Sequence, residues 1–121
     1  MAKVYFYVNA VIYLGLAIWC TLKHEQTAQA SGYLMLNSSG HSEYLVVYGG
    51  LQIGVAAFYT YLALHPEYAS VGVIFSALMY APIVLYRIIT VSIHWPVSSV
   101  TLGTASLELT LLAWSLFLLR R

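Results

Sequence analysis

Four long apolar stretches divide the chain, and most polar residues fall in the segments between them. The stretches cover residues 4–22, 44–64, 69–93 and 97–119. Each is close to the ~20 residues that a helix needs to cross the hydrocarbon core of a bilayer. They lack the strict alternation of barrel strands, and a helix satisfies its own backbone hydrogen bonds in lipid. The pattern predicts an all-α integral membrane protein, with residues 1–121 forming one domain of four transmembrane helices.

The connections between the apolar stretches predict how the helices are arranged. Residues 23–43 form one long polar loop that contains several turn-forming residues. The other two breaks are short and centred on Pro66 and Pro96. Short connections make neighbouring helices antiparallel, so the expected fold is an antiparallel four-helix bundle.

The distribution of cationic residues predicts the orientation in the membrane. An even number of spans puts both termini on one side, together with Lys3, Arg120 and Arg121, whereas Lys23 lies on the other side. Cytoplasmic segments carry an excess of Lys and Arg. We therefore expect a multi-pass protein of the inner (plasma) membrane with cytoplasmic termini and an outer loop at residues 23–43.

Aromatic residues near the ends of the spans predict an aromatic belt. Trp and Tyr combine an apolar ring with a polar atom and accumulate at the two membrane surfaces. The expected belt residues are Trp19 and Trp95 near the outer ends, and Tyr5, Tyr7, Tyr68 and Trp114 near the inner ends.

The composition agrees with a membrane environment and restricts the partners. Hydrophobic residues make up 61% of the chain and charged residues only 7%, with a mean hydropathy of +0.80. Soluble domains carry about 25% charged residues. The net charge of +1 and the absence of a basic run argue against a nucleic-acid partner, so membrane lipid is the expected environment. The single cysteine, Cys20, excludes an internal disulfide.

Two charged residues fall inside the predicted membrane spans. Arg87 precedes the turn at His94, and Glu108 follows the start of the last apolar stretch, so both lie roughly 10 to 16 Å below the outer surface. A charge at the bilayer centre costs at least ~2.5 to 3.5 kcal/mol and needs a partner inside the protein. Because the third and fourth helices are antiparallel neighbours, we expect an Arg87–Glu108 ion pair.

Further polar residues extend this predicted site. Glu43 opens the second span on the same side, and Tyr44, Tyr48 and Gln52 form a polar stripe on that helix at steps of four residues. We predict a ligand-binding site formed by Glu43, Tyr48, Gln52, Arg87 and Glu108. The alternative is a structural clamp that fixes the register of the helices. On the other edge of the second helix, Gly50 and Gly54 form a GxxxG pattern that predicts close helix packing and is compatible with a homo-oligomer.

Catalytic and metal sites are not indicated by the sequence. The four histidines show no mutual ligand spacing, and none lies inside a span as a haem ligand would. Glu108 is too deep to orient a loop histidine in a triad, and no nucleophile motif is present. We therefore predict no catalytic residue and no metal ligand. A non-enzymatic role is favoured, and the sequence does not identify a cofactor.

The segment from Ser31 to Gln52, with its Ser-Glu-Tyr and Tyr-Gly-Gly blocks, resembles a family of small bacterial four-helix membrane proteins known only as a domain of unknown function. That family is similar in layout to the DoxX-like proteins. Arg87 and Glu108 match charged positions of the family. The chain has Leu45 where the family usually has Arg, and His94-Trp95-Pro96 replaces its usual acidic turn. The resemblance implies a bacterial inner membrane, and the DoxX-like relatives imply quinone-coupled or redox-accessory roles.

Three functions are compatible with these observations. The first is a non-enzymatic membrane protein that binds a small lipophilic ligand, such as a quinone or a lipid, at the intramembrane polar site. The second is a small proton-coupled exporter, although its essential carboxylate should be unpaired. The third is an assembly or accessory subunit that binds another membrane protein through its glycine face.

Overall fold

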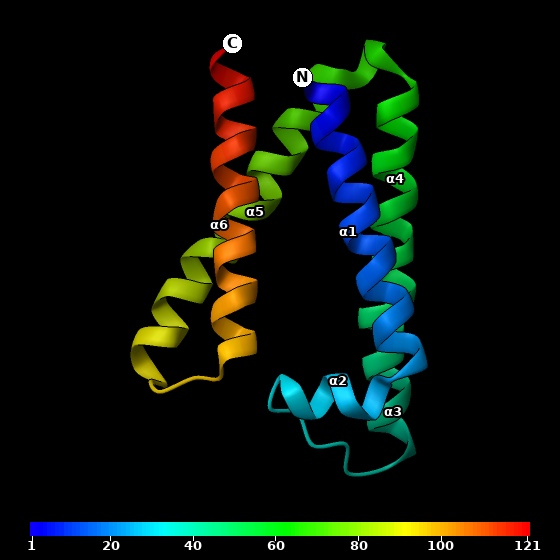
Figure 1. Ribbon diagram of the computed structural model, residues 1–121, viewed down its shortest axis with the longest axis vertical. Coiled ribbons are helices and arrows are strands. Elements are labelled where there is room, and N and C mark those ends of the chain that lie inside the picture. Colours follow the sequence, from blue (N-terminus) through cyan, green and yellow to red (C-terminus); the bar gives the residue numbers. More distant parts are fainter.

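The computed structural model describes residues 1–121 as helices joined by short connections, without a β-strand (Figure 1). The all-α prediction is confirmed. The elements in chain order are α1 (Ala2–Leu22), α2 (His24–Ala30), α3 (Ser38–Leu45), the π-helix η1 (Val46–Leu51), α4 (Gln52–Leu64), the 3₁₀ helix η2 (Pro66–Tyr68), α5 (Ala69–Ile93) and α6 (Ser99–Arg120).

Four helical segments are long and apolar enough to cross a membrane: Ala2–Leu22, Ser38–Leu64, Pro66–Ile93 and Ser99–Arg120. The second begins at Ser38 and not at Tyr44, because the Asn37 side chain accepts a hydrogen bond from the Gly40 amide at 3.1 Å and caps the helix. Part of the predicted outer loop is therefore helical, and α2 adds a further short helix to that segment.

The bundle consists of two antiparallel helix pairs (Figure 1). Helix α1 packs most extensively against α4, and α5 packs most extensively against α6. The pairs come together at the end that carries both termini, and they lie further apart at the other end, where α2 lies across the bundle. There the Ser98 hydroxyl donates a 3.4 Å hydrogen bond to the Ala30 carbonyl, which connects the end of α2 to the start of α6.

The core lies in the half of the bundle near the termini. Its fully buried members include Tyr5 and Phe6 of α1, Tyr59 of α4 and Tyr80 of α5. Tyr5 donates a 3.0 Å hydrogen bond to the Leu111 carbonyl and thereby connects α1 to α6. The prediction that Tyr5 belongs to the aromatic belt was wrong, because its ring is fully buried.

A hydrogen-bond network crosses this core. The Tyr80 hydroxyl donates to Asn9 Oδ1 at 2.6 Å and lies 2.8 Å from the Tyr13 hydroxyl. The hydroxyls of Tyr59 and Ser76 lie 2.8 Å apart. Buried polar groups in lipid need partners because no water is present, and these bonds connect α5 to both α1 and α4. The network therefore joins one helix pair to the other.

Close helix approach occurs at glycines other than the predicted ones. A Cβ atom on Gly72 would lie 2.7 Å from both Leu62 and Phe6, and one on Gly49 would lie 2.8 Å from the Thr21 hydroxyl. Gly50 and Gly54 have no neighbouring atom within 4 Å. Within the chain, helix packing therefore uses Gly49 and Gly72, and the GxxxG pair lies on an open face.

Candidate functional site

Arg87 of α5 and Glu108 of α6 form a two-point ion pair. Arg87 Nε donates to Glu108 Oε2 at 2.9 Å, and Arg87 Nη2 donates to Glu108 Oε1 at 2.6 Å. The planar guanidinium matches the two carboxylate oxygens, which is the strongest geometry for such a pair. The predicted pairing of these residues is present in the structure.

The fold positions this pair through the short connection between α5 and α6, which makes the two helices antiparallel neighbours (Figure 1). The side chain of Glu108 is 14% exposed and that of Arg87 is 31% exposed. The acid is therefore mostly enclosed, whereas part of the guanidinium stays accessible at the surface of the bundle.

An apolar groove of about 420 Å³ adjoins Arg87. Its lining residues come only from α5 and α6: Val84, Arg87, Ile88, Leu102, Ala105, Ser106 and Leu109. Ile88 is 60% exposed and Leu109 is 54% exposed, so the groove opens on the outer surface of the bundle. In a bilayer this surface faces the acyl chains, and the guanidinium is the only charged group lining the groove.

Glu43 does not join the ion pair. Its side chain is exposed on α3, and it lines a separate cavity of about 390 Å³ together with Tyr33, Tyr44 and Tyr48. The only ion pair of the structure is Arg87–Glu108. Glu43, predicted to belong to the same site as Arg87 and Glu108, therefore lies in the last turn of α3 and lines a different cavity from Arg87.

Tyr48 lines the cavity beside Glu43 and packs against other tyrosines there. Its hydroxyl lies 2.8 Å from the Tyr33 hydroxyl, and its ring stacks on Tyr44 with a centroid distance of 4.5 Å. Tyr33 was not predicted to belong to the site, because it lies in a connection whose path the sequence pattern does not determine.

Gln52 is placed differently from the other predicted residues. Its Oε1 atom is buried and has no hydrogen-bond partner. It lines neither the groove beside Arg87 nor the cavity beside Glu43. It follows the π-helix η1, which spans Val46–Leu51 and contains Tyr48. π-Helical turns are rare and are often found at functional sites, so Tyr48 and Gln52 both lie where the second span departs from regular α-helix.

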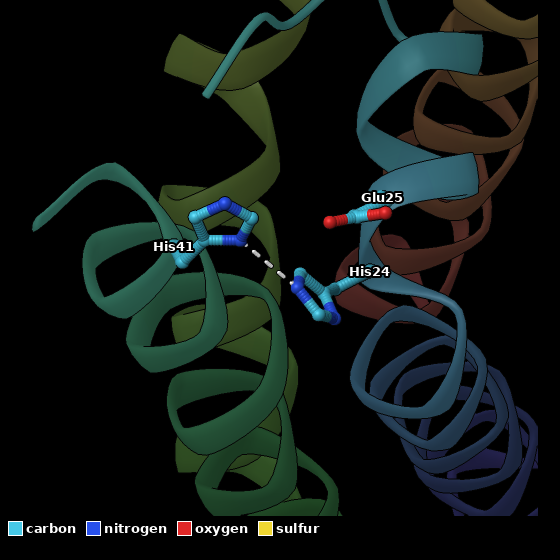
Figure 2. A group of neighbouring side chains, drawn as sticks. All are labelled: His24, Glu25 and His41. Atoms are coloured by element: carbon cyan, nitrogen blue, oxygen red, sulfur yellow. Dashed lines mark hydrogen bonds between the residues drawn. The ribbon is translucent and has the colours of Figure 1, made fainter. Parts of the chain in front are cut away.

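Two histidines far apart in the chain are in contact at the end of the bundle opposite the termini. His24 Nε2 of α2 and His41 Nδ1 of α3 lie 3.0 Å apart, with Glu25 beside them (Figure 2). The spacing of the histidines along the chain did not predict this contact. The path of residues 31–37, which turns the chain back from α2 to α3, brings the two rings together.

Comparisons with known proteins place the chain in a family. The family described as "Domain of unknown function (DUF4345)" matches residues 1–119. No curated protein and no solved structure gave a match. The matched region covers almost all of the four helical spans and includes every residue of the candidate site. The chain therefore belongs to the DUF4345 family.

Proposed function

We propose that the protein is a non-enzymatic membrane protein that binds a small amphiphilic molecule, a quinone or a lipid, at Arg87. In this proposal the apolar part of the ligand lies in the groove between α5 and α6, and its polar oxygen accepts hydrogen bonds from the guanidinium. The observation that carries the proposal is that Arg87 has N–H donors without a hydrogen-bond acceptor in the protein and lies beside an apolar groove.

The donors of Arg87 support this role. A guanidinium has five N–H donors. The two bonds to Glu108 use one donor on Nε and one on Nη2, and no other protein group accepts a hydrogen bond from Arg87. Three donors therefore remain for a ligand oxygen. In hydrocarbon an unpaired polar group is costly, so an acceptor that reaches these donors from the lipid is stabilised there.

The charge of the site favours one kind of headgroup. Glu108 compensates the charge of Arg87, so the pair as a whole is neutral. A second full negative charge would have to lose its hydration without a compensating cation. A neutral carbonyl oxygen needs no such compensation. The proposed ligand is therefore a quinone, or a lipid that presents an ester carbonyl, in preference to a lipid bound through its phosphate.

Filling the groove provides the test. Ala105→Phe places a ring in the groove and leaves Arg87 and Glu108 in place, whereas Ala113→Phe adds the same ring at an exposed position of α6 outside it. Thermal stabilisation and native mass spectrometry with an isoprenoid quinone and with a neutral phospholipid are the measurements. We expect Ala105→Phe to weaken binding at least about tenfold, because it removes an apolar pocket of the size that ligands occupy, and Ala113→Phe to bind as the parent does.

Two outcomes would contradict the proposal. Equal ligand affinity of the Ala105→Phe variant and the parent would show that the groove is not the binding site. If no quinone and no lipid raises the melting temperature of the parent, the protein does not bind a ligand of this class. Arg87→Lys separates charge from geometry, since lysine keeps the charge but lacks the planar fork, and we expect it to lose most of the binding.

The alternative functions receive less support. Both carboxylate oxygens of Glu108 accept bonds from Arg87, whereas a proton-coupled exporter requires an accessible acid. An accessory subunit would use an open surface such as the one around Gly50 and Gly54. A stoichiometric partner in a mild-detergent pull-down that is lost in Gly54→Leu would favour the accessory role.

We also propose an orientation with cytoplasmic termini in a bacterial inner membrane. Figure 1 places both termini at one end of the bundle, where Lys3, Arg120 and Arg121 supply three cations against Lys23 at the other end. A green fluorescent protein fused to the C-terminus should fluoresce, and alkaline phosphatase fused there should be inactive. The opposite result would reverse the orientation.

A further inference from the structure

We propose that His24, Glu25 and His41 form a binding site for a divalent metal ion of the Zn²⁺ class. The site lies at the end of the bundle opposite the termini and is separate from the Arg87 groove. One potential ligand atom from each residue lies within 4.8 Å of the other two. In Figure 2 both imidazole rings and the Glu25 carboxylate lie around one small space between α2 and α3.

The spacing of the two imidazoles fits a metal. His24 Nε2 and His41 Nδ1 lie 3.0 Å apart. Zn²⁺ binds imidazole nitrogen at ~2.0 to 2.1 Å, and in a tetrahedral site two such nitrogens lie about 3.4 Å apart. The rings therefore need to separate by only about 0.4 Å. Without metal the contact holds as a hydrogen bond, with one ring donating its N–H to the other.

The surrounding structure holds together the two helix turns that carry His24 and His41. One turn beyond His24, Thr27 accepts a 2.8 Å hydrogen bond from the Tyr44 hydroxyl, and Tyr44 lies one turn beyond His41. Tyr44 also packs with Cys20 and Ala28 in a small buried cluster. The two helix turns that carry the ligands are thereby fixed against each other, so little ordering is required when a metal binds.

The chemistry of the three groups selects the class of metal. Imidazole nitrogen suits Zn²⁺, Ni²⁺ and Cu²⁺, whereas Ca²⁺ and Mg²⁺ prefer oxygen ligands alone. The Glu25 carboxylate supplies one negative charge, and His24 and His41 can bind as neutral rings. A cavity of about 180 Å³, lined by Glu25 and His41, adjoins the cluster. It provides room for water at the remaining coordination position, so the site would be open in the manner of three-ligand zinc sites.

Zinc binding to the detergent-purified protein tests the proposal, with the chain purified through a tag that lacks histidine. The parent should bind Zn²⁺ with one-to-one stoichiometry and melt at a higher temperature in its presence. His24→Ala and His41→Ala should each weaken binding by about 100-fold or more, because even changes beside a metal ligand cost 10-fold to 100-fold in affinity. Glu25→Gln should weaken it less, because two imidazoles remain.

The matched control is His94→Ala, which removes an exposed histidine at the same end of the bundle. Its affinity for Zn²⁺ should equal that of the parent. The proposal would be overturned if the three site variants and His94→Ala all had the same affinity for Zn²⁺, or if the parent had no saturable Zn²⁺ site.

A measurement on the unaltered chain covers the case in which a variant does not fold. X-ray absorption of the zinc-loaded parent should show nitrogen and oxygen ligands with outer-shell scattering from two imidazoles. A sulfur ligand would place the metal at Cys20 instead, and a spectrum without imidazole scattering would place it on adventitious surface groups. Either spectrum would overturn the assignment.

Discussion

Removing Arg87 should destabilise the helical bundle through the acid that it leaves behind. Arg87→Ala deletes both hydrogen bonds to Glu108, whose side chain is only 14% exposed. Breaking a fully buried pair by removing one partner costs about 3 to 5 kcal/mol, whereas an exposed pair in water contributes about 0 to 1 kcal/mol. Because Arg87 is 31% exposed, we expect an intermediate loss of about 2 to 4 kcal/mol.

A double-mutant cycle isolates the pair from other effects of the substitution. Glu108→Gln should cost less than Arg87→Ala, because the amide oxygen still accepts a hydrogen bond from the guanidinium. The double variant Arg87→Ala/Glu108→Gln leaves no unpaired acid. Its free energy of unfolding should therefore exceed the additive expectation by about 1 to 3 kcal/mol, the range found for residues in direct contact.

Reversible unfolding in mixed micelles, followed by tryptophan fluorescence, measures these free energies. Arg120→Ala is the control, since Arg120 is exposed near the C-terminus and forms no ion pair, and its effect should stay below about 0.5 kcal/mol. The reasoning would be refuted by an Arg87→Ala variant as stable as the parent. Strict additivity in the double variant would show that the two charges are energetically independent.

Two further predictions concern the core. Asn9→Ala removes the acceptor of the Tyr80 hydroxyl and should lower the free energy of unfolding by about 1 to 2 kcal/mol in the same assay. This is near the upper end measured for hydrogen bonds between membrane helices. An unchanged free energy of unfolding would mean that the bond contributes nothing to stability. Gly72→Ala should cost about 1 to 3 kcal/mol because its Cβ would meet Phe6 at 2.7 Å. Gly54→Ala has open space around the new methyl group and should gain up to about 1 kcal/mol from helix propensity. Equal effects of the two variants on stability would argue against the packing described for α5.

The helical spans could be predicted because they depend on composition along the chain. A run of about 20 apolar residues identifies a span wherever its neighbours lie. The start of the second span could not be placed in this way, because it is set by the Asn37 cap and not by apolarity. The helix α2 is too short and too polar to give a span signal.

The candidate site was predictable in part for a similar reason. Arg87 and Glu108 had to meet, because each is a lone charge in a span and the turn between their helices is short. The position of Glu43 depends on the direction in which the last turn of α3 faces, and the Tyr33 and His24 contacts depend on the path of an irregular segment. The spacing of polar and apolar residues along the chain predicts neither the direction of that turn nor the path of that segment.

The Tyr80 hydroxyl contributes little to the insertion of the helices into the membrane but does contribute to their assembly into one bundle. Insertion depends on the summed transfer free energies of the residues in each span, to which one phenol group adds little. Once a span is in hydrocarbon, that phenol finds its acceptor on a different span, at Asn9. A chain with phenylalanine at this position would enter the bilayer as readily as the parent but would lose a contact that selects one arrangement of its helices over others.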